Sequence, residues 1–197
     1  GSHLVRALLE EALEVVVLDD LSSGQRANLP DHPSLHFRQG SILDGPTVSE
    51  CAAGCRAVFH LAAVASVVES VAHPVRTHRV NTEGTVHVLE AAAQEGAKVV
   101  FSSSSAVYGE GPDEFKAEGS LIQPLSPYAL HKFASEDYGR LYGPLRGVEG
   151  VCLRYFNVFG PRQNPNSEYA AVVPKFVRRA LDGESVTIFG DGEQTRD

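Results

Sequence analysis

The alternation of short apolar runs with longer stretches of helical periodicity limits this chain to very few folds. The apolar runs, bounded by Gly, Pro, Ser and Asp, predict strands at 14–19, 35–37, 57–63, 98–101, 150–156 and 186–189. Apolar positions at helical spacing between them predict helices from about residue 4 and over 44–53, 74–95, 126–142 and 172–181. Strands that alternate with helices in this way predict an α/β fold with a doubly wound parallel sheet.

The composition is that of an ordinary soluble globular protein. The 197 residues are 43% hydrophobic and 21% charged, which is enough for one domain and the start of a second. The formal net charge of -8 argues against a nucleic acid or an anionic membrane surface as the partner. No apolar run approaches the length of a membrane span, and the first residues lack a basic-then-apolar signal pattern. We therefore expect a cytoplasmic protein with no membrane partner.

Cysteine and histidine spacing gives no sign of a metal site. Cys51, Cys55 and Cys152 form neither a C-x-x-C pair nor a zinc spacing, so we expect reduced cysteines in core or surface positions. The eight histidines include no H-E-x-x-H pattern. His60, within a predicted buried strand, is more typical of a hydrogen-bonded core histidine than of a ligand. No metal is expected.

The strongest chemical signal is a tyrosine and a lysine four residues apart. Ser126 and Pro127 are a helix cap and first helical residue, so Tyr128 and Lys132 share one face at the start of a helix. A free phenol has a pKa of about 10 and is a poor base near neutral pH. A neighbouring ammonium stabilises the phenolate and lowers that pKa, as a general base requires.

Asp19 ends the first predicted strand, which follows a short amphipathic helix. Helix, strand and terminal acid are the second half of a dinucleotide-binding unit, in which the acid accepts hydrogen bonds from the adenosine ribose. A carboxylate there repels a 2′-phosphate, so Asp19 favours NAD over NADP as cofactor. Gly1 stands where the last glycine of the phosphate-binding turn would be. The sequence Gly1-Ser2-His3 also fits a remnant of tag cleavage, although its continuation into the helix favours a natural sequence.

Two further polar features lie on predicted elements. Hydroxyl side chains at 102–105 follow the strand at 98–101, and the carboxyl ends of parallel strands are where α/β sites collect. Asn81 lies inside the helix at 74–95, where asparagine is unfavourable. Either its amide bonds a neighbouring active-site loop, or it lies on a solvated face.

Taken together, the motifs resemble a known family. The stretches VVVLDDLSSG, VFHLAA, VNTEGTVHVLEAA, VFSSSSAVYG, SPYALHK, LRYFNVFGPRQNP and FGDGEQTRD occur in family order over essentially the whole chain. The chain resembles the extended short-chain dehydrogenase/reductases, and within them the nucleotide-sugar epimerases typified by UDP-glucose 4-epimerase. The resemblance implies a Rossmann-like fold, NAD as cofactor and a UDP-sugar as substrate.

The resemblance also implies roles for individual residues. Tyr128 and Lys132 correspond to the catalytic pair, and Ser104 to the active-site hydroxyl that also touches the substrate. Cofactor-binding positions correspond to Gly1, Asp19, Asn81, Tyr128 and Lys132. Substrate-binding positions for the nucleotide diphosphate correspond to Asn157 and Arg196. As a departure, Ser41 stands where many members have an aspartate near the adenine, which weakens that contact.

The implied reaction is epimerisation at C4 of a UDP-hexose through a transient keto-sugar. In the family's chemistry the tyrosine takes a proton from the sugar hydroxyl, and a hydride leaves the same carbon for NAD and then returns to the other face. A nucleotide-sugar dehydratase or decarboxylase is the alternative within the family, and a non-catalytic NAD-binding protein is the alternative outside it. UDP-glucose, UDP-N-acetylglucosamine and UDP-glucuronate all remain open as substrates.

The resemblance further implies that the chain lacks both ends of the family's fold. We expect a Rossmann-like domain without its first strand at 1–157 and the beginning of a substrate-binding region at 158–197. In the strand order 3-2-1-4-5-6 the first strand is central, so the strands ending at Asp19 and beginning at Ala57 should each face an unfilled slot. We expect the chain as given to be an inactive, poorly stable fragment that binds NAD weakly. A homodimer is an option for the full-length parent.

Overall fold

The computed structural model describes residues 1–111, 115–163, 172–188 and 190–193. The chain divides into two compact units, Gly1–Arg154 and Tyr155–Asp197. In the described part of the second unit, the regular element is helix α7 (Val172–Leu181). None of the helices in the described residues has the length and apolar character that crossing a membrane requires.

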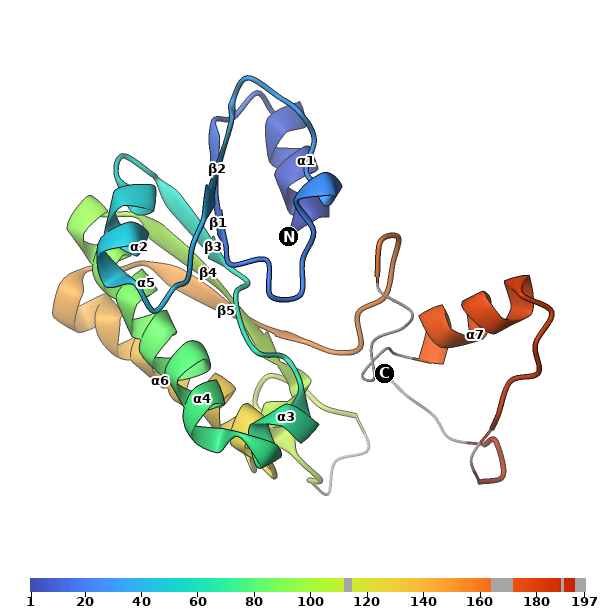
Figure 1. Cartoon of the computed structure of the whole chain (residues 1–197). Coiled ribbons are helices and arrows are strands. Elements are labelled where there is room, and N and C mark those ends of the chain that lie inside the picture. Colours follow the sequence, from blue (N-terminus) through green and yellow to red (C-terminus); the bar gives the residue numbers. More distant parts are fainter. Residues whose placement is uncertain (112–114, 164–171, 189, 194–197) are drawn as a thin grey trace. The chain divides into compact units, whose positions relative to one another are not determined.

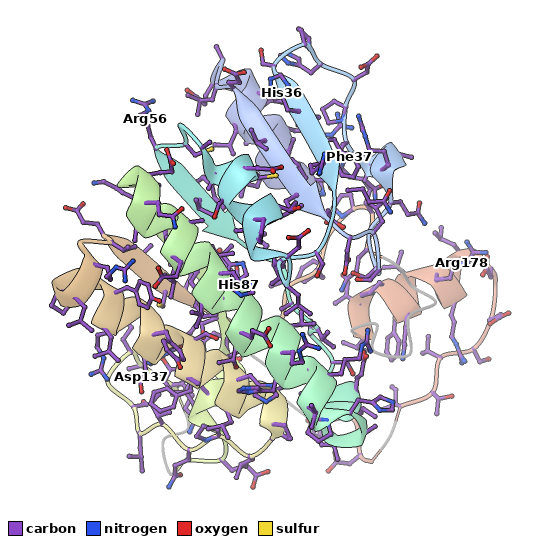
Figure 2. The ribbon with its side chains drawn as sticks, turned by 60° about the vertical axis from the view of Figure 1, so that its left-hand side comes forward. His36, Phe37, Arg56, His87, Asp137 and Arg178 are labelled. Atoms are coloured by element: carbon purple, nitrogen blue, oxygen red, sulfur yellow. The ribbon has the colours of Figure 1, made fainter. Side chains whose placement is uncertain are left out.

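The first unit alternates strands with helices, as predicted. The listing in chain order is α1 (Ser2–Glu10), β1 (Val15–Asp19), η1 (Arg26–Asn28), β2 (Leu35–Gln39), α2 (Gly45–Ala52), β3 (Ala57–His60), α3 (Val67–Ala72), α4 (Pro74–His78), η2 (Arg79–Glu83), α5 (Gly84–Glu95), β4 (Lys98–Ser104), η3 (Ser105–Tyr108), α6 (Pro127–Arg146) and β5 (Gly150–Tyr155). Strand β1 pairs parallel with β2, and β3 pairs parallel with β4. Figures 1 and 2 show α2, α5 and α6 along one side of the strands and α1 on the other side of β1 and β2. The fold is a doubly wound α/β fold.

The sheet is divided where the sequence predicts an open slot. Strands β1 and β2 form one sheet, and β3, β4 and β5 form a second sheet with β4 in the middle. Among the described residues no strand joins β1 to β3. Val16 on β1 and Phe59 on β3 are 40% and 38% exposed, although both belong to apolar runs that predict buried strands.

Three apolar clusters hold the layers together. Buried residues of α1 and β1 form one cluster. Residues of α2, α5 and the loop before α2 form a second, and residues of α5, β4 and the turns before β4 and β5 form a third. Their members are Val5, Leu9 and Val15; Ile42, Val48, Ala52, Val88 and Ala91; and Leu89, Ala92, Ala97, Val99 and Val148. Helix α5 contributes to two of the three, so it is the element that joins α2 to the three-stranded sheet.

Several boundaries differ from the sequence prediction: β3 ends at His60 and not at residue 63, and β4 continues past residue 101 to Ser104. Helix α6 continues past the expected end at residue 142 to Arg146, because Tyr142 and Arg146 both bond Glu90 on α5. It ends at Gly147, whose φ of 72° is the left-handed conformation that glycine adopts readily. The strand expected at 186–189 is wrong for its described residues, since 184–188 form no strand, and Ile188 is 60% exposed.

Two glycines beside a cavity provide a test of the packing between α6, β4 and β5. A Cβ on Gly150 would lie 2.5 Å from the Val99 carbonyl oxygen, so alanine there would push β5 away from β4. A Cβ on Gly139, inside α6, would lie 3.8 Å from the Cys152 sulfur and extend into a cavity of about 230 Å³.

We expect Gly150→Ala to lower the free energy of unfolding by about 1–3 kcal/mol, because backbone atoms must move apart. Gly139→Ala is the matched control and should raise it by about 0.5–1 kcal/mol through helix propensity. Urea unfolding followed by circular dichroism measures both. A Gly150→Ala variant as stable as the parent would contradict this description of the β4–β5 contact.

Candidate active site

The first turn of α6 fixes the backbone of the candidate base. The Ser126 side chain accepts a hydrogen bond from the Ala129 N–H, and Pro127 is the first helical residue, as predicted. The Tyr128 N–H donates to the Ser70 hydroxyl at 3.0 Å, and Ser70 in turn donates to the Val67 carbonyl. Helix α3 thereby satisfies a free N–H at the start of α6. Tyr128 is 9% exposed.

Strand β4 brings a hydroxyl to the phenol of Tyr128. Ser104 is the last residue of β4, and its side chain accepts a hydrogen bond from the Ala106 N–H at 3.2 Å, which caps the turn η3. The Ser104 side chain lies close enough to the Tyr128 phenol to lower its pKa. The structure thus brings Ser104 and Tyr128 together at the carboxyl end of β4.

Lys132 lies buried beside both residues. Its Nζ atom donates to the Ser102 carbonyl at 2.7 Å and lies 4.9 Å from the centre of the Phe101 ring. The same atom is 6.0 Å from the centre of the Tyr128 ring. The spacing of four residues therefore puts the two side chains on one buried face of α6, as predicted.

The pKa values of this pair differ from the expectation. Burial raises the pKa of Tyr128, and the Ser104 side chain offsets that rise only in part. Burial lowers the pKa of Lys132 to about 8, because the charged form is desolvated. The expected lowering of the Tyr128 pKa by Lys132 does not hold in this structure, since the ammonium is directed at the Ser102 carbonyl and desolvation dominates both groups.

Asn81 lies in a π-helical turn, η2, of the continuous helical run from α4 to α5. Its side chain accepts from the Val64 N–H at 2.8 Å and donates to the Val64 carbonyl at 3.0 Å. Of the two alternatives left by the sequence, the structure has the first: the amide bonds a loop, which follows β3. Asn81 is 1% exposed, and π-helical turns are common at functional sites.

A chain of hydrogen bonds links β3, α5 and α6 next to the site. The Thr85 hydroxyl donates its one proton to the Asn81 carbonyl at 2.7 Å. It must therefore accept in its bond with His60 Nε2 at 2.9 Å, so we assign the His60 proton to Nε2. Ser135 on α6 also donates to the Asn81 carbonyl, at 2.9 Å. His60 is thus a hydrogen-bonded core histidine. Burial, followed by the charge of Lys132, lowers its pKa to about 3.

The remaining predicted residues lie elsewhere. Asp19 ends β1 with an exposed carboxylate that accepts the Leu21 N–H at 2.7 Å. Gly1 is the N-cap of α1, and Asn157 is exposed in the second unit. Arg196 lies outside the described residues.

Sequence reasoning missed two residues next to the site, Ser70 and Glu136. Ser70 bonds Tyr128 across a separation of 58 residues, which no local pattern reveals. Glu136 could have been found, because it continues the Tyr128–Lys132 spacing by another four residues on the buried face of α6.

The sequence matches a known family and individual relatives within it. Residues 1–197 match the NAD dependent epimerase/dehydratase family. The chain is 40% identical to the UDP-glucose 4-epimerase of Mycolicibacterium smegmatis over 203 residues, covering 100% of the chain and 64% of that relative. The chain spans less than two thirds of the length of the curated relatives that it matches.

Solved structures of similar fold include nucleotide-sugar epimerases and dehydratases. UDP-N-acetylglucosamine 4-epimerase from Methanobrevibacter ruminantium, in complex with UDP-N-acetylmuramic acid, is similar with a TM-score of 0.95 and 44% identity, covering 100% of this chain and 64% of that one. A dTDP-glucose 4,6-dehydratase from Streptomyces venezuelae, solved with NAD bound, is similar with a TM-score of 0.87 and 35% identity, covering 100% and 63%.

The buried neutral His60 makes stability fall in acid. Its folded-state pKa of about 3 lies below the ordinary histidine pKa of 6.5, so below pH 6.5 the unfolded chain binds a proton that the folded chain does not. The His60 contribution is present above pH 6.5 and is lost as the pH falls toward 3. Between pH 7 and pH 5 the free energy of unfolding should fall by about 2 kcal/mol on this account.

His60→Gln tests this, because a glutamine amide can still donate to Thr85 but does not titrate. We expect chemical unfolding at pH 7 and pH 5 to give a clearly smaller difference for His60→Gln than for the parent. The control is His32→Gln in an exposed loop, which should behave like the parent. An unchanged pH dependence in His60→Gln would show that His60 is not responsible.

Proposed function

The chain belongs to the NAD dependent epimerase/dehydratase family, and on that premise we propose that it supplies the cofactor-binding and catalytic part of an NAD-dependent UDP-hexose 4-epimerase. The observation that carries the proposal is the convergence of Ser104, Tyr128 and Lys132, all at the carboxyl end of β4 or the start of α6. A phenol beside a hydroxyl, with an ammonium close by, is suited to moving a proton to and from a sugar hydroxyl.

Each of the three residues has a separate task in this proposal. Tyr128 takes the proton from the C4 hydroxyl of the sugar and later gives it back. Ser104 hydrogen-bonds the reacting oxygen while it changes from hydroxyl to carbonyl. A bound NAD would supply reversible hydride transfer at C4, and return of the hydride to the opposite face of the sugar would leave no net oxidation.

Lys132 supplies the charge that a Tyr128 phenolate needs. As the structure stands, burial raises the Tyr128 pKa, so the phenol keeps its proton at neutral pH. Lys132 Nζ already lies 6.0 Å from the Tyr128 ring centre. A shift of this ammonium from the Ser102 carbonyl toward the phenol would lower the Tyr128 pKa. We propose that binding of cofactor and substrate favours this shift.

The residues at the carboxyl end of β1 fit an adenosine ribose. The Asp19 carboxylate is exposed and bonds a backbone N–H two residues away, which leaves oxygen lone pairs for ribose hydroxyls. Gly1 begins a helix of nine residues, whose N-terminal N–H groups suit a pyrophosphate. Asn81 fixes the loop after β3 through both of its bonds to Val64, and this loop is the proposed floor of the cofactor site.

The substrate proposed is a UDP-hexose held through its diphosphate by Asn157 and Arg196. Support comes from the relatives, which include a UDP-glucose 4-epimerase and a UDP-N-acetylglucosamine 4-epimerase. UDP-glucose, UDP-N-acetylglucosamine and UDP-glucuronate are the candidate substrates.

A nucleotide-sugar dehydratase or decarboxylase is the second candidate, favoured by the similarity to a dTDP-glucose 4,6-dehydratase and to a UDP-N-acetyl-alpha-D-glucosaminuronate decarboxylase. Those reactions need an acidic group beside the active-site hydroxyl to move a second proton or orient a carboxylate. Here Ser105 and Ala106 follow Ser104, which supports epimerisation. A non-catalytic NAD-binding protein would have no need of both Tyr128 and Lys132.

Tyr128→Phe tests the chemistry. In the intact protein it should lower the rate of UDP-glucose to UDP-galactose conversion by about two orders of magnitude or more, because the general base is removed. Binding of the nucleotide sugar, measured by calorimetry, should stay nearly unchanged. Tyr138→Phe on the exposed face of α6 is the control and should keep full activity. A loss of only two- or threefold in Tyr128→Phe would remove Tyr128 from the role of general base.

Asp19→Ala tests the cofactor assignment. The parent should bind NAD more tightly than NADP, because the carboxylate bonds the ribose hydroxyls and repels a 2′-phosphate. Asp19→Ala should narrow the difference in affinity between NAD and NADP. Asp20→Ala is the control, since Asp20 bonds the Ser22 N–H in the same turn and should leave the preference intact. Equal affinities of the parent for the two cofactors in titration calorimetry would contradict this role of Asp19.

A further inference from the structure

An ion pair between a buried carboxylate and a partly buried guanidinium lies one helical turn beyond Lys132. Glu136 on α6 is 8% exposed, and Arg154 on β5 binds both of its carboxylate oxygens. Arg154 Nη2 is 2.7 Å from Oε2, and Nε is 3.0 Å from Oε1 and 3.2 Å from Oε2. The hydrogen bonds to Glu136 raise the pKa of the Arg154 guanidinium, so Arg154 keeps its charge.

The two charged groups reach the segments on either side of Ser104. The Ser103 hydroxyl donates to Glu136 Oε1. Arg154 Nη1 donates to the Tyr108 hydroxyl at 3.1 Å, and the guanidinium carbon lies 4.9 Å from the centre of the Tyr108 ring. Ser103 is 4% exposed and Tyr108 is 3% exposed. Ser103 directly precedes Ser104, and Tyr108 ends the turn η3 that Ser104 caps.

Arg154 also bonds the segment between η3 and α6. Arg154 Nη1 donates to the Glu118 carbonyl at 3.2 Å, within the irregular segment between η3 and α6. One side chain on β5 therefore connects α6, the end of β4 with η3, and the segment that leads back to Tyr128. All of these residues belong to the first unit.

From this geometry we propose that Glu136 and Arg154 are a positioning pair, which holds Ser104 beside the Tyr128 phenol. The proposal rests on the proposed function for its effect on turnover. Tyr128 and Glu136 are eight residues apart on one helix, about 12 Å along its axis. Fixing Glu136 against Ser103 therefore fixes α6 against β4 along the whole length of the site.

The energetics of such pairs favour a positioning role over a stabilising one. Removing two charges from water offsets most of their attraction, so a buried ion pair contributes little net stability compared with apolar residues of similar volume. Removing one partner alone leaves an unpaired buried charge and strongly destabilises the fold. The useful variant therefore removes both charges together.

The test compares two double variants on the same helix in the intact protein. Glu136→Gln/Arg154→Met neutralises the buried pair and keeps similar side-chain volumes. The control, Asp137→Asn/Arg140→Met, neutralises the ion pair on the solvent side of α6, where the two side chains are 41% and 77% exposed and 2.7 Å apart. Figure 2 shows Asp137 on this helix.

We expect the buried-pair variant to lower kcat for UDP-hexose epimerisation about tenfold, as loss of one aligned hydrogen bond would, with KM within a factor of two. Adding Ser104→Ala should cause little further loss, because both changes remove the same contact. The solvent-side variant should retain the kcat of the parent. An unchanged kcat in the buried-pair variant, or losses that multiply when Ser104→Ala is added, would overturn the proposal.

A second readout does not depend on the reaction. With tyrosine labelled at the ring carbon that bears the hydroxyl, NMR titration reports the pKa of Tyr128, and Tyr128→Phe assigns its signal. That pKa should rise in the buried-pair variant as much as in Ser104→Ala, and not in the solvent-side variant. If the parent does not convert UDP-hexoses but these pKa changes occur, the proposed function fails and the positioning pair stands. If Tyr128 titrates as in the parent, the positioning pair fails.

Discussion

The whole site depends on the way the buried face of α6 packs against β4. A helix usually buries an apolar stripe, but this one buries Tyr128, Lys132, Ser135 and Glu136. Burying these polar groups is costly unless each is hydrogen-bonded. Lys132 bonds a carbonyl of β4, Ser135 bonds the Asn81 carbonyl, and Glu136 bonds Arg154. These directional bonds therefore fix the register between α6 and β4. An apolar contact would leave that register free to shift.

The polar contacts form a continuous layer across four elements. The layer runs from the loop after β3, through Asn81 and Thr85 on the π-helical turn and α5, to Ser135 on α6. A helix with regular geometry would use the Asn81 carbonyl for its own backbone ladder. The π-helical turn makes that carbonyl an acceptor for two side chains instead. The loop proposed to line the cofactor site and the helix that carries the proposed base are thus held by the same residue.

Local sequence signals predicted the parts of this structure that depend on neighbouring residues. Apolar runs predicted the strands from β1 to β5. A cap predicted the start of α6 at Ser126, and a spacing of four residues predicted the shared face of Tyr128 and Lys132. The division between β1–β2 and β3–β5 followed from the strand order of the fold. Features that depend on distant partners were not predictable in this way. The last turn of α6 depends on Glu90, and the Glu136–Arg154 pair joins two different elements. The rise in the Tyr128 pKa depends on burial, which no spacing reveals.

The most direct test of the proposed chemistry follows the hydrogen on C4 of the sugar. UDP-galactose carrying deuterium at C4 is incubated with the intact protein and NAD in ordinary water, and the product is analysed by NMR and mass spectrometry. If hydride leaves C4 and returns to the opposite face of the same carbon, UDP-glucose forms with deuterium retained at C4 and no NADH accumulates. A product that has exchanged the C4 deuterium with water would contradict the proposed reaction, as would loss of the C6 oxygen or of carbon dioxide.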